Sequence, residues 1–479
     1  MVPNRGIYRL ALALYAGLAL VTLAFGYWQV IAAPGLLRRP ENTRPLELLL
    51  HSPRGAILDR NGTVLARSVP GPDGIYRREY PAVEAAPVVG YFNPSLGRAG
   101  IEAAADGTLQ RVRWPQWPWS LRAGVVAGDV RLTLDAGLQA QIFRLFGGRA
   151  GAAVVMAPDG AVLALVSSPT FDPNRLAAGQ PDEATLAYLH TLQADAGAPL
   201  LNRATQGQYA PGSTFKTVTL AAALELGAVR ADEVFDYELN PRDASHPVPW
   251  HTNGLVTCGN IYLLASGNRV RLDVAHAYAW SCNVTHANLA LRLGAPALLD
   301  YARRFGFEST IPFDLPVTPS RLQQRPDFFT GPEARYALAS TGMGQGELLV
   351  TPLQMALVAA AVANDGRVPR PRLLADRPAE TWRQAIRPDV ARQMRAFMTI
   401  SVAEGWARPA GVAGVAVAGK TGTAEAVPGR PAHSWFIGFA PADNPRVVLA
   451  LVVEEGGSST QVAAPLASQI LRAALAAVR

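Results

Sequence analysis

The first long apolar stretch of the chain lies close to its N-terminus. Leu10 to Ala33 contains no charged residue and is mostly hydrophobic, so it is long enough to cross a bilayer of about 30 Å as a helix. Arg5 and Arg9 precede the stretch, and a Tyr-Trp pair near its far end lies where aromatic residues gather at a membrane interface. The pattern predicts a cytoplasmic tail and a transmembrane anchor over residues 1–33.

A cleavable signal peptide is the alternative interpretation of this stretch. The apolar region is longer than a signal peptide requires, and Pro34 follows Ala33, the one small-residue cleavage site in the region. These features favour an anchor that stays in the protein. Arg38, Arg39 and Arg44 lie just beyond the stretch, so charge counting leaves its orientation open, and a long C-terminal portion can be exported regardless of such charges.

Short strand-like runs with frequent Gly and Pro follow the anchor as far as Gly128. Asn61-Gly62 stands between two apolar runs of the segment from Arg54 to Ala66, and this dipeptide is typical of a β-hairpin turn. We expect residues 34–130 to form a small non-catalytic module.

Longer patterns begin at Leu132 and predict a larger domain over residues 131–479. Helical spacing is present in residues 134–146, 215–226, 351–362 and 461–478. Strand-like runs form one early pair and one late group of three: Ala152 to Met156, Ala161 to Ser167, Val412 to Thr423, Ser434 to Phe439 and Val447 to Val453. Two early and three late strands, with helices between them and at both ends, predict an α+β layered domain.

Composition excludes some functions. The net charge is +7 and is spread without a run of like charges, and no nucleic-acid-reading motif accompanies it, so no nucleic acid is expected as a partner. The seven histidines include no pair at metal-binding spacing, so neither zinc nor another cofactor is expected.

Lysine is nearly absent, because only Lys216 and Lys420 occur among the 44 basic residues. Arginine serves equally well for surface charge but cannot lose its proton near neutral pH. Ser213 begins a helix after a Pro-Gly turn, where backbone N–H groups favour negative charge, and spacing i, i+3 puts Lys216 on the same face. The pair fits a nucleophile and its general base, although many helices contain such a pair by chance.

Two further short motifs carry hydroxyl, amide and ammonium groups. Ser281-Cys282-Asn283 lies between two helical patterns, where it can present polar groups to a cleft or can simply be a helix N-cap. Lys420-Thr421-Gly422-Thr423 ends a strand whose glycines allow another backbone to approach closely. Such an edge can bind an extended peptide by strand addition and hold its carboxylate.

Together and in this order, Ser-x-x-Lys, Ser-x-Asn and Lys-Thr-Gly are the signature of penicillin-binding proteins and serine β-lactamases. The chain resembles class B penicillin-binding proteins along nearly its whole length, and the short module and the Cys258/Cys282 pair resemble the actinobacterial type. The similarity extends to Arg54–Ala66, Ala99–Glu102, Tyr209–Lys216, Gly344–Gly346 and Thr351–Ala356. It implies a transpeptidase domain with a five-stranded antiparallel sheet flanked by helices.

The resemblance also implies the site. It assigns catalytic roles to Ser213, Lys216, Ser281, Asn283 and Lys420, and substrate binding to Thr421, Gly422 and Thr423. Ser213 would attack the carbonyl between the two terminal D-alanines of a peptidoglycan stem peptide, and Lys216 would take its proton. Ser281 would relay a proton to the leaving D-alanine, and Asn283 would hold the substrate amide and orient Lys216. Backbone N–H groups of Ser213 and Thr423 would form the oxyanion hole, and the Lys420 motif would anchor the carboxylate.

Alternatives of the same and of other classes remain at this point. A β-lactamase would share the acylation but hydrolyse the adduct quickly, yet no second carboxylate marks a deacylating base. Intact motifs argue against a catalytically silent scaffold. A single anchor with no cytoplasmic domain argues against a β-lactam sensor. The resemblance implies a single-pass protein of the cell membrane with an extracytoplasmic catalytic domain, inhibited by β-lactams and partnered by a membrane-embedded SEDS-family glycosyltransferase.

The two cysteines and a tryptophan-rich segment can each be interpreted in more than one way. Cys258 and Cys282 are the only cysteines and lie on the side expected to be oxidising, which favours a disulfide over two separately buried thiols. The tryptophan-rich segment from Trp114 to Trp119 is expected to pack between the module and the catalytic domain, or else to contact the membrane surface or a membrane partner.

Overall fold

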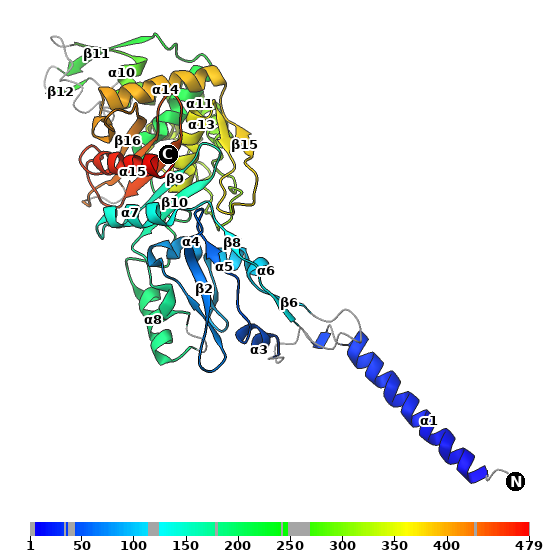
Figure 1. The fold of residues 1–479 in the computed structure, drawn as a ribbon. Helices are drawn as coiled ribbons and strands as arrows, with labels where there is room; N and C mark the ends of the chain where they lie inside the picture. The colour runs from blue at the N-terminus through cyan, green and yellow to red at the C-terminus, as the bar shows by residue number, and fades with distance from the viewer. Residues whose placement is uncertain are drawn as a thin grey trace.

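A computed structural model of the chain describes residues 5–32, 35–36, 44–113, 124–177, 181–240, 243–247, 269–425 and 429–478. A long N-terminal helix, a small module and a larger domain follow one another along the molecule (Figure 1). Cys258 and the segment from Trp114 to Trp119 lie outside the described residues, so the expectation for that tryptophan-rich segment stays a prediction.

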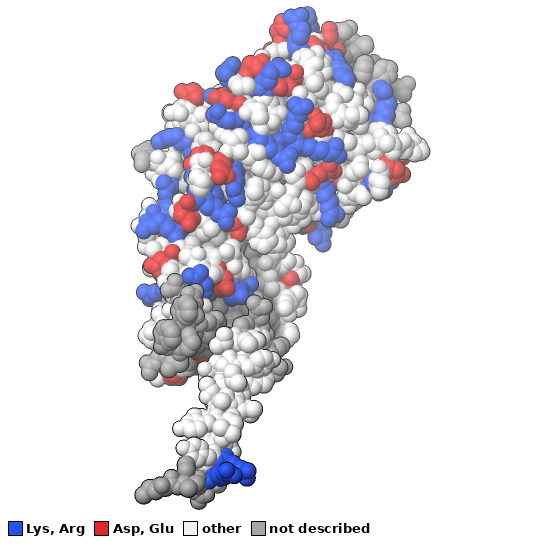
Figure 2. Space-filling view, turned by 90° about the vertical axis from the view of Figure 1, so that its right-hand side faces the viewer, with Lys and Arg blue, Asp and Glu red and all other residues white. Residues whose placement is uncertain are grey.

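Helix α1 (Arg5–Gly26) continues through a π-helical turn, η1 (Tyr27–Ile31), and meets the length and composition of a membrane span. The combined helix has 27 residues and a mean hydropathy of 1.9, and none of it is buried against the rest of the protein. It projects from the body as an uncharged rod with basic residues at its tip (Figure 2). The helix begins at Arg5, before the apolar stretch, so Arg5 and Arg9 both belong to it.

The module contains a four-stranded sheet of order β3-β2-β1-β8. The hairpin predicted at Asn61-Gly62 forms between β1 and β2, and Gly62 takes the positive φ that the turn requires. The strands are β1 (Ile57–Leu58), β2 (Val64–Pro70), β3 (Tyr76–Glu79), β4 (Phe92–Asn93), β5 (Gly97–Arg98), β6 (Arg111–Arg113), β7 (Gly124–Val126) and β8 (Val130–Arg131). The helices are α3 (Arg44–Leu50), α4 (Ala86–Val89), α5 (Gly100–Ala104) and α6 (Asp106–Leu109).

A buried ionic cluster holds the module together around Glu102, whose side chain is fully buried. Arg54 Nε donates to Glu102 Oε2 at 2.6 Å and Arg78 Nε donates to Oε1 at 2.7 Å. The Tyr80 hydroxyl donates to the same carboxylate at 3.2 Å. A buried carboxylate is tolerated only when its oxygens are satisfied in this way, so the cluster ties the start of the module to β3 and α5.

The larger domain is built on one antiparallel sheet of five strands, in the order β10-β9-β18-β17-β16. Its strands are β9 (Gly151–Met156), β10 (Val162–Ser168), β16 (Ala418–Ala424), β17 (His433–Ala440) and β18 (Val447–Val453). The predicted α+β class and five-stranded sheet are confirmed. The prediction that the third strand begins at Val412 is wrong, because Gly414 at φ +74° turns the chain back and pairs Val412 with Val415 instead. The strand begins at Ala418.

Both faces of this sheet are covered, so alternate residues of each strand enter different cores. Val154, Ala450 and Ile437 belong to the core under the central helices, whereas Val155 and Leu449 belong to the core under the first and last helices. The central helices are α9 (Lys216–Glu225), α10 (Val274–Ala279), α11 (Asn283–Arg304), α12 (Ala334–Gly342), α13 (Pro352–Ala363) and α14 (Pro388–Ala403). Helices α7 (Ala136–Phe146) and α15 (Ala463–Ala477) cover the opposite face.

The remaining elements lie outside these layers. They are α8 (Glu183–Ala194), β11 (Val234–Asn240), β12 (Asp243–Pro247), β13 (Arg269–Asp273), β14 (Arg367–Pro369) and β15 (Thr381–Gln384).

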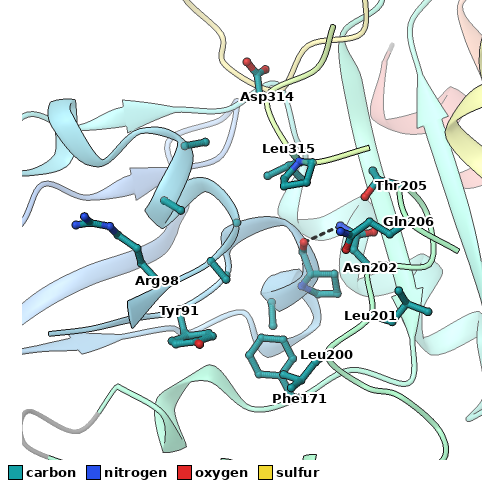
Figure 3. A pocket seen from close by; sticks show the side chains of 18 of the residues that line it. Tyr91, Arg98, Phe171, Leu200, Leu201, Asn202, Thr205, Gln206, Asp314 and Leu315 are labelled. Carbon is teal, nitrogen blue, oxygen red and sulfur yellow. Dashed lines mark hydrogen bonds between the residues drawn. The ribbon is translucent and has the colours of Figure 1, made fainter. Parts of the chain in front are cut away.

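A pocket of about 800 Å³ lies at the junction of the module and the larger domain and is lined by residues of both (Figure 3). Asn202 Nδ2 donates to the carbonyl of Pro87 across the junction at 2.8 Å. Asn174 bridges the same two parts, because its side chain accepts from the Tyr80 N–H and donates to the Tyr80 carbonyl. The sequence-predicted site residues do not line this cavity.

Candidate active site

Ser213 lies in a tight 3₁₀ turn, η4 (Gly212–Phe215), that leads directly into α9. The turn needs glycine at its start, since Gly212 has φ +54° and a Cβ there would lie 2.6 Å from the Thr423 carbonyl oxygen. Thr214 Oγ1 closes the turn by donating to the Pro211 carbonyl at 2.7 Å. Ser213 therefore faces the cleft from the start of a helix, as predicted, although its own turn is 3₁₀ rather than α.

Lys216, the first residue of α9, is fully buried and reaches the second motif. Its Nζ lies 2.8 Å from the Ser281 carbonyl oxygen, 2.5 Å from Asn283 Oδ1 and 3.1 Å from Ser281 Oγ. The first two oxygens can only accept, whereas the hydroxyl can also donate. A neutral amine satisfies all three contacts with its two N–H groups and one lone pair, so this site accommodates the form that a general base requires.

Ser281 sits at a strained position just after α10. Its φ is +57°, and the backbone N–H groups of Ser281 and Cys282 bond back to the carbonyls of Tyr278 and Ala277. This is the Schellman ending of a helix, where glycine is the usual residue. The left-handed conformation is unfavourable for serine, but a serine at this position places its hydroxyl beside Lys216. The N-cap alternative is therefore wrong for Ser281, because Cys282 is the N-cap of α11.

The third motif occupies β16, the edge strand of the sheet. Gly422 allows the strand to pass close to the serine turn, since a Cβ there would lie 2.8 Å from the Pro211 carbonyl oxygen. The predicted close backbone approach is confirmed at Gly422, whereas Gly419 makes room for the ring of Phe436. Thr421 is buried, while Thr423 is exposed and bonds to Ser459 Oγ at 2.9 Å.

Both lysines are fully buried, and no carboxylate in the described part of the chain forms an ion pair with either of them. Lys420 Nζ donates to the Thr421 carbonyl at 3.2 Å and lies 5.6 Å from the centre of the Tyr278 ring. Burial lowers the pKa of Lys420 to about 7. Burial, and then the positive charge of Lys420, holds the pKa of Lys216 well below its usual value. The arrangement favours a neutral Lys216 close to a cationic Lys420.

These elements enclose a cleft of about 380 Å³. Its wall includes six of the eight predicted site residues, namely Ser213, Ser281, Asn283, Thr421, Gly422 and Thr423. Lys216 and Lys420 lie beneath that wall. Trp280, Trp406 and Ser458–Thr460 complete it, and no motif marked them in the sequence.

Other polar residues near the cleft have structural partners. His286 is buried below the lysines, with Nδ1 donating to the Cys282 carbonyl at 2.8 Å. Burial, and then the charge of Lys216, keeps the pKa of His286 well below its usual value, so the imidazole is neutral. His433 accepts from the Glu455 N–H at 3.1 Å. No group of three or more His, Cys, Asp or Glu that could hold a metal occurs in the described parts of the chain.

Cys282, between the two catalytic candidates of the second motif, is fully buried and disulfide-bonded. The sequence favoured a disulfide over free thiols, and this interpretation is confirmed for Cys282. A covalent tether at this residue restrains the loop that holds Ser281 and Asn283.

Family models match both parts of the chain. The model of the penicillin-binding protein transpeptidase domain matches residues 151–472, and the model of the penicillin-binding protein A dimerisation domain matches residues 54–116. The chain belongs to the penicillin-binding proteins. It is therefore an enzyme of the serine-type D-Ala-D-Ala transpeptidase class.

Relatives cover nearly the whole length of this penicillin-binding protein. It is 33% identical to the peptidoglycan D,D-transpeptidase PbpA of Mycobacterium tuberculosis H37Rv, over 98% of this chain and 99% of that protein. A D,D-transpeptidase domain from Eggerthella lenta is similar in structure, with a TM-score of 0.74, 34% identity, and coverage of 89% of this chain and 99% of that one. The imipenem acyl-enzyme of M. tuberculosis penicillin-binding protein A has a TM-score of 0.76 and 31% identity, over 89% and 100% of the two chains.

Proposed function

We propose that this enzyme cross-links peptidoglycan stem peptides through an acyl-enzyme on Ser213, formed at the D-Ala-D-Ala terminus of the donor. The observation that carries the proposal is the contact set of Lys216. Lys216 follows Ser213 by three residues, and its buried amine has a lowered pKa and contacts two acceptor oxygens and a hydroxyl of the second motif. That environment suits a group that takes a proton and passes it on.

The reaction follows from these positions. Ser213 Oγ attacks the penultimate carbonyl while Lys216 takes its proton, and the oxyanion accepts from the backbone N–H groups of Ser213 and Thr423. Ser281 then gives its hydroxyl proton to the departing amine and is reprotonated by Lys216. An amine from a second stem peptide reverses these steps, and a cross-link replaces the ester.

The carboxylate of the donor has a matching anchor. Thr421 and Thr423 offer hydroxyls at the edge strand, Gly422 lets that strand approach the serine turn, and buried Lys420 supplies positive charge below them. Asn283 reaches both Lys216 and the cleft, so it can orient the base and hold the substrate amide.

The same chemistry predicts covalent inhibition by β-lactams with a long-lived adduct. Among the described residues that line the cleft none is a carboxylate, so none of them can serve as the base that activates water for deacylation. Purified full-length protein in detergent should hold a penicilloyl adduct for many minutes, and it should transfer the acyl group of a D-alanyl thioester to a D-amino acid. Hydrolysis of a chromogenic cephalosporin at many molecules per second would instead identify a membrane-anchored β-lactamase.

We also propose the placement of the protein. Helix α1 anchors it with Arg5 and Arg9 on the cytoplasmic side, and the catalytic domain lies outside the membrane, where peptidoglycan is assembled. The partner is a SEDS-family glycosyltransferase that contacts α1 and the module of Arg54–Glu102, in cell-wall synthesis during elongation or division. Co-purification of such a glycosyltransferase with the intact chain, and its loss when α1 is replaced by an unrelated membrane helix, tests the partnership. Protease digestion of intact protoplasts tests the orientation.

A further inference from the structure

Two tryptophans form one corner of the catalytic cleft. The rings of Trp280 and Trp406 meet edge to face, with centroids 5.5 Å apart and planes at 80°. Both side chains are half-buried and both line the cleft. We call this pair the tryptophan corner.

Hydrogen bonds to backbone carbonyls hold the tryptophan corner in place. The Trp406 N–H donates to the Ala279 carbonyl at 3.2 Å, and Trp406 Nε1 donates to the Trp280 carbonyl at 2.9 Å. Gly405 lies so close to the end of α10 that a Cβ there would lie 2.3 Å from the Ala279 carbonyl oxygen. The loop after α14 is therefore docked on the residues that immediately precede Ser281.

The same wall continues to the other side of the cleft. Thr460 Oγ1 donates to the Trp406 carbonyl at 3.2 Å, and the neighbouring Ser459 Oγ lies 2.9 Å from Thr423 Oγ1. The corner thus lies between Ser281 and Thr423. Under the proposed function, on which this inference rests, Ser281 protonates the departing amine and Thr423 helps to hold its carboxylate. Both groups belong to the leaving D-alanine, so the corner lies beside the leaving group.

We propose that the tryptophan corner binds the apolar side of the leaving group, its Cα methyl above all, and so selects donors whose terminal residue carries a small aliphatic side chain. Two indoles offer apolar surface, and no residue lining the described cleft is charged. A charged terminal side chain would therefore find no partner there, whereas a methyl group loses only contact with water.

A pair of donor thioesters isolates this one methyl group. The first is N-benzoyl-D-alanyl mercaptoacetate, and the second is the corresponding thioester of D-2-mercaptopropionate, which differs only by a methyl on the leaving group. In each case the Ser213 Oγ–carbonyl bond forms, the C–S bond breaks, and the thiol leaves with one proton. The released thiol is followed with a chromogenic disulfide, and the measured quantity is the ratio of the two kcat/KM values.

In the native protein we expect the methylated leaving group to react about tenfold faster, because one methyl in an apolar pocket is worth roughly that much. Trp406→Ala and, independently, Trp280→Ala should bring the ratio close to one. Trp406→Phe keeps an aromatic face without the indole N–H and should restore most of the ratio. Trp382→Ala is the matched control, because this half-buried tryptophan lies on β15 and does not line the cleft; it should leave the ratio unchanged.

Three results would overturn the inference, and they differ from one another. Equal loss of both rates in Trp406→Ala and Trp280→Ala, with the native ratio kept, would mean that the corner is only structural. A native ratio near one would mean that the methyl group does not reach the corner. Failure of the native protein to react with either thioester or with penicillin would refute the proposed function itself.

Discussion

The buried position of Lys420 predicts how acylation depends on pH. Lys420 is fully buried on β16, and burial lowers its pKa to about 7. The role proposed for Lys420, a carboxylate anchor, requires the charged form, whereas Lys216, the proposed base, can act only when it is neutral. Acylation should therefore rise as Lys216 loses its proton and fall again as Lys420 loses its own, which gives a bell-shaped profile.

The size of the alkaline decrease follows from that pKa. Half of the free enzyme has a charged Lys420 at pH 7 and about one hundredth at pH 9, so the second-order acylation constant should fall about fifty-fold between these values. In Lys420→Arg the guanidinium stays charged throughout this range, so the decrease should disappear. The variant should be slower at neutral pH by roughly 10–10³-fold, because the planar head group fits poorly where a compact ammonium sat.

Stopped-flow acylation by a fluorescent penicillin, measured from pH 5.5 to 9 with far-UV circular dichroism at each pH, provides the test. The quantity to compare is kcat/KM, or its acylation equivalent, since it reports the free enzyme. An alkaline decrease that persists in Lys420→Arg would refute the assignment to Lys420. A native profile that is flat over the whole range would refute the claim that acylation depends on the protonation states of the two lysines.

Two further predictions concern the scaffold. Glu102→Ala leaves buried Arg78 without a carboxylate and buried Arg54 with Asp106 alone, so it should lower the free energy of unfolding by about 3–5 kcal/mol in urea titrations. Glu79→Gln, at an exposed ion pair, should produce no measurable change, and equal effects of the two substitutions would contradict the role of the buried cluster. Gly344→Ala places a Cβ 1.8 Å from the Gly212 carbonyl oxygen, so it should shift the serine turn and slow acylation at least tenfold. Gly97→Ala also has positive φ but has no atom near its Cβ, and it should acylate normally.

Local patterns predicted much of the fold. The strand from Val447 to Val453 has the bounds expected from its continuous apolar run, because every residue of a central strand covered on both faces is buried. The Asn61-Gly62 hairpin forms for an equally local reason. The adjacency of β9 and β18 could not be predicted in this way, because it depends on pairing between segments nearly 300 positions apart.

The candidate site likewise has residues that the sequence predicted and residues that it could not predict. Ser213, Lys216 and the Lys420 motif stand out because few residue types can do their chemistry. The left-handed backbone of Ser281 could not be expected, since serine at that position is locally unfavourable. Trp406 and Ser459 belong to no motif, and only the docking of distant loops brings them to the cleft.

Intact mass and peptide mapping after exposure to benzylpenicillin test the central claim most directly. The account predicts one penicilloyl group per chain, located on the peptide that contains Ser213, and no adduct on Ser213→Ala, with the two proteins melting at similar temperatures. An adduct on another residue, or an undiminished adduct on Ser213→Ala, would contradict it.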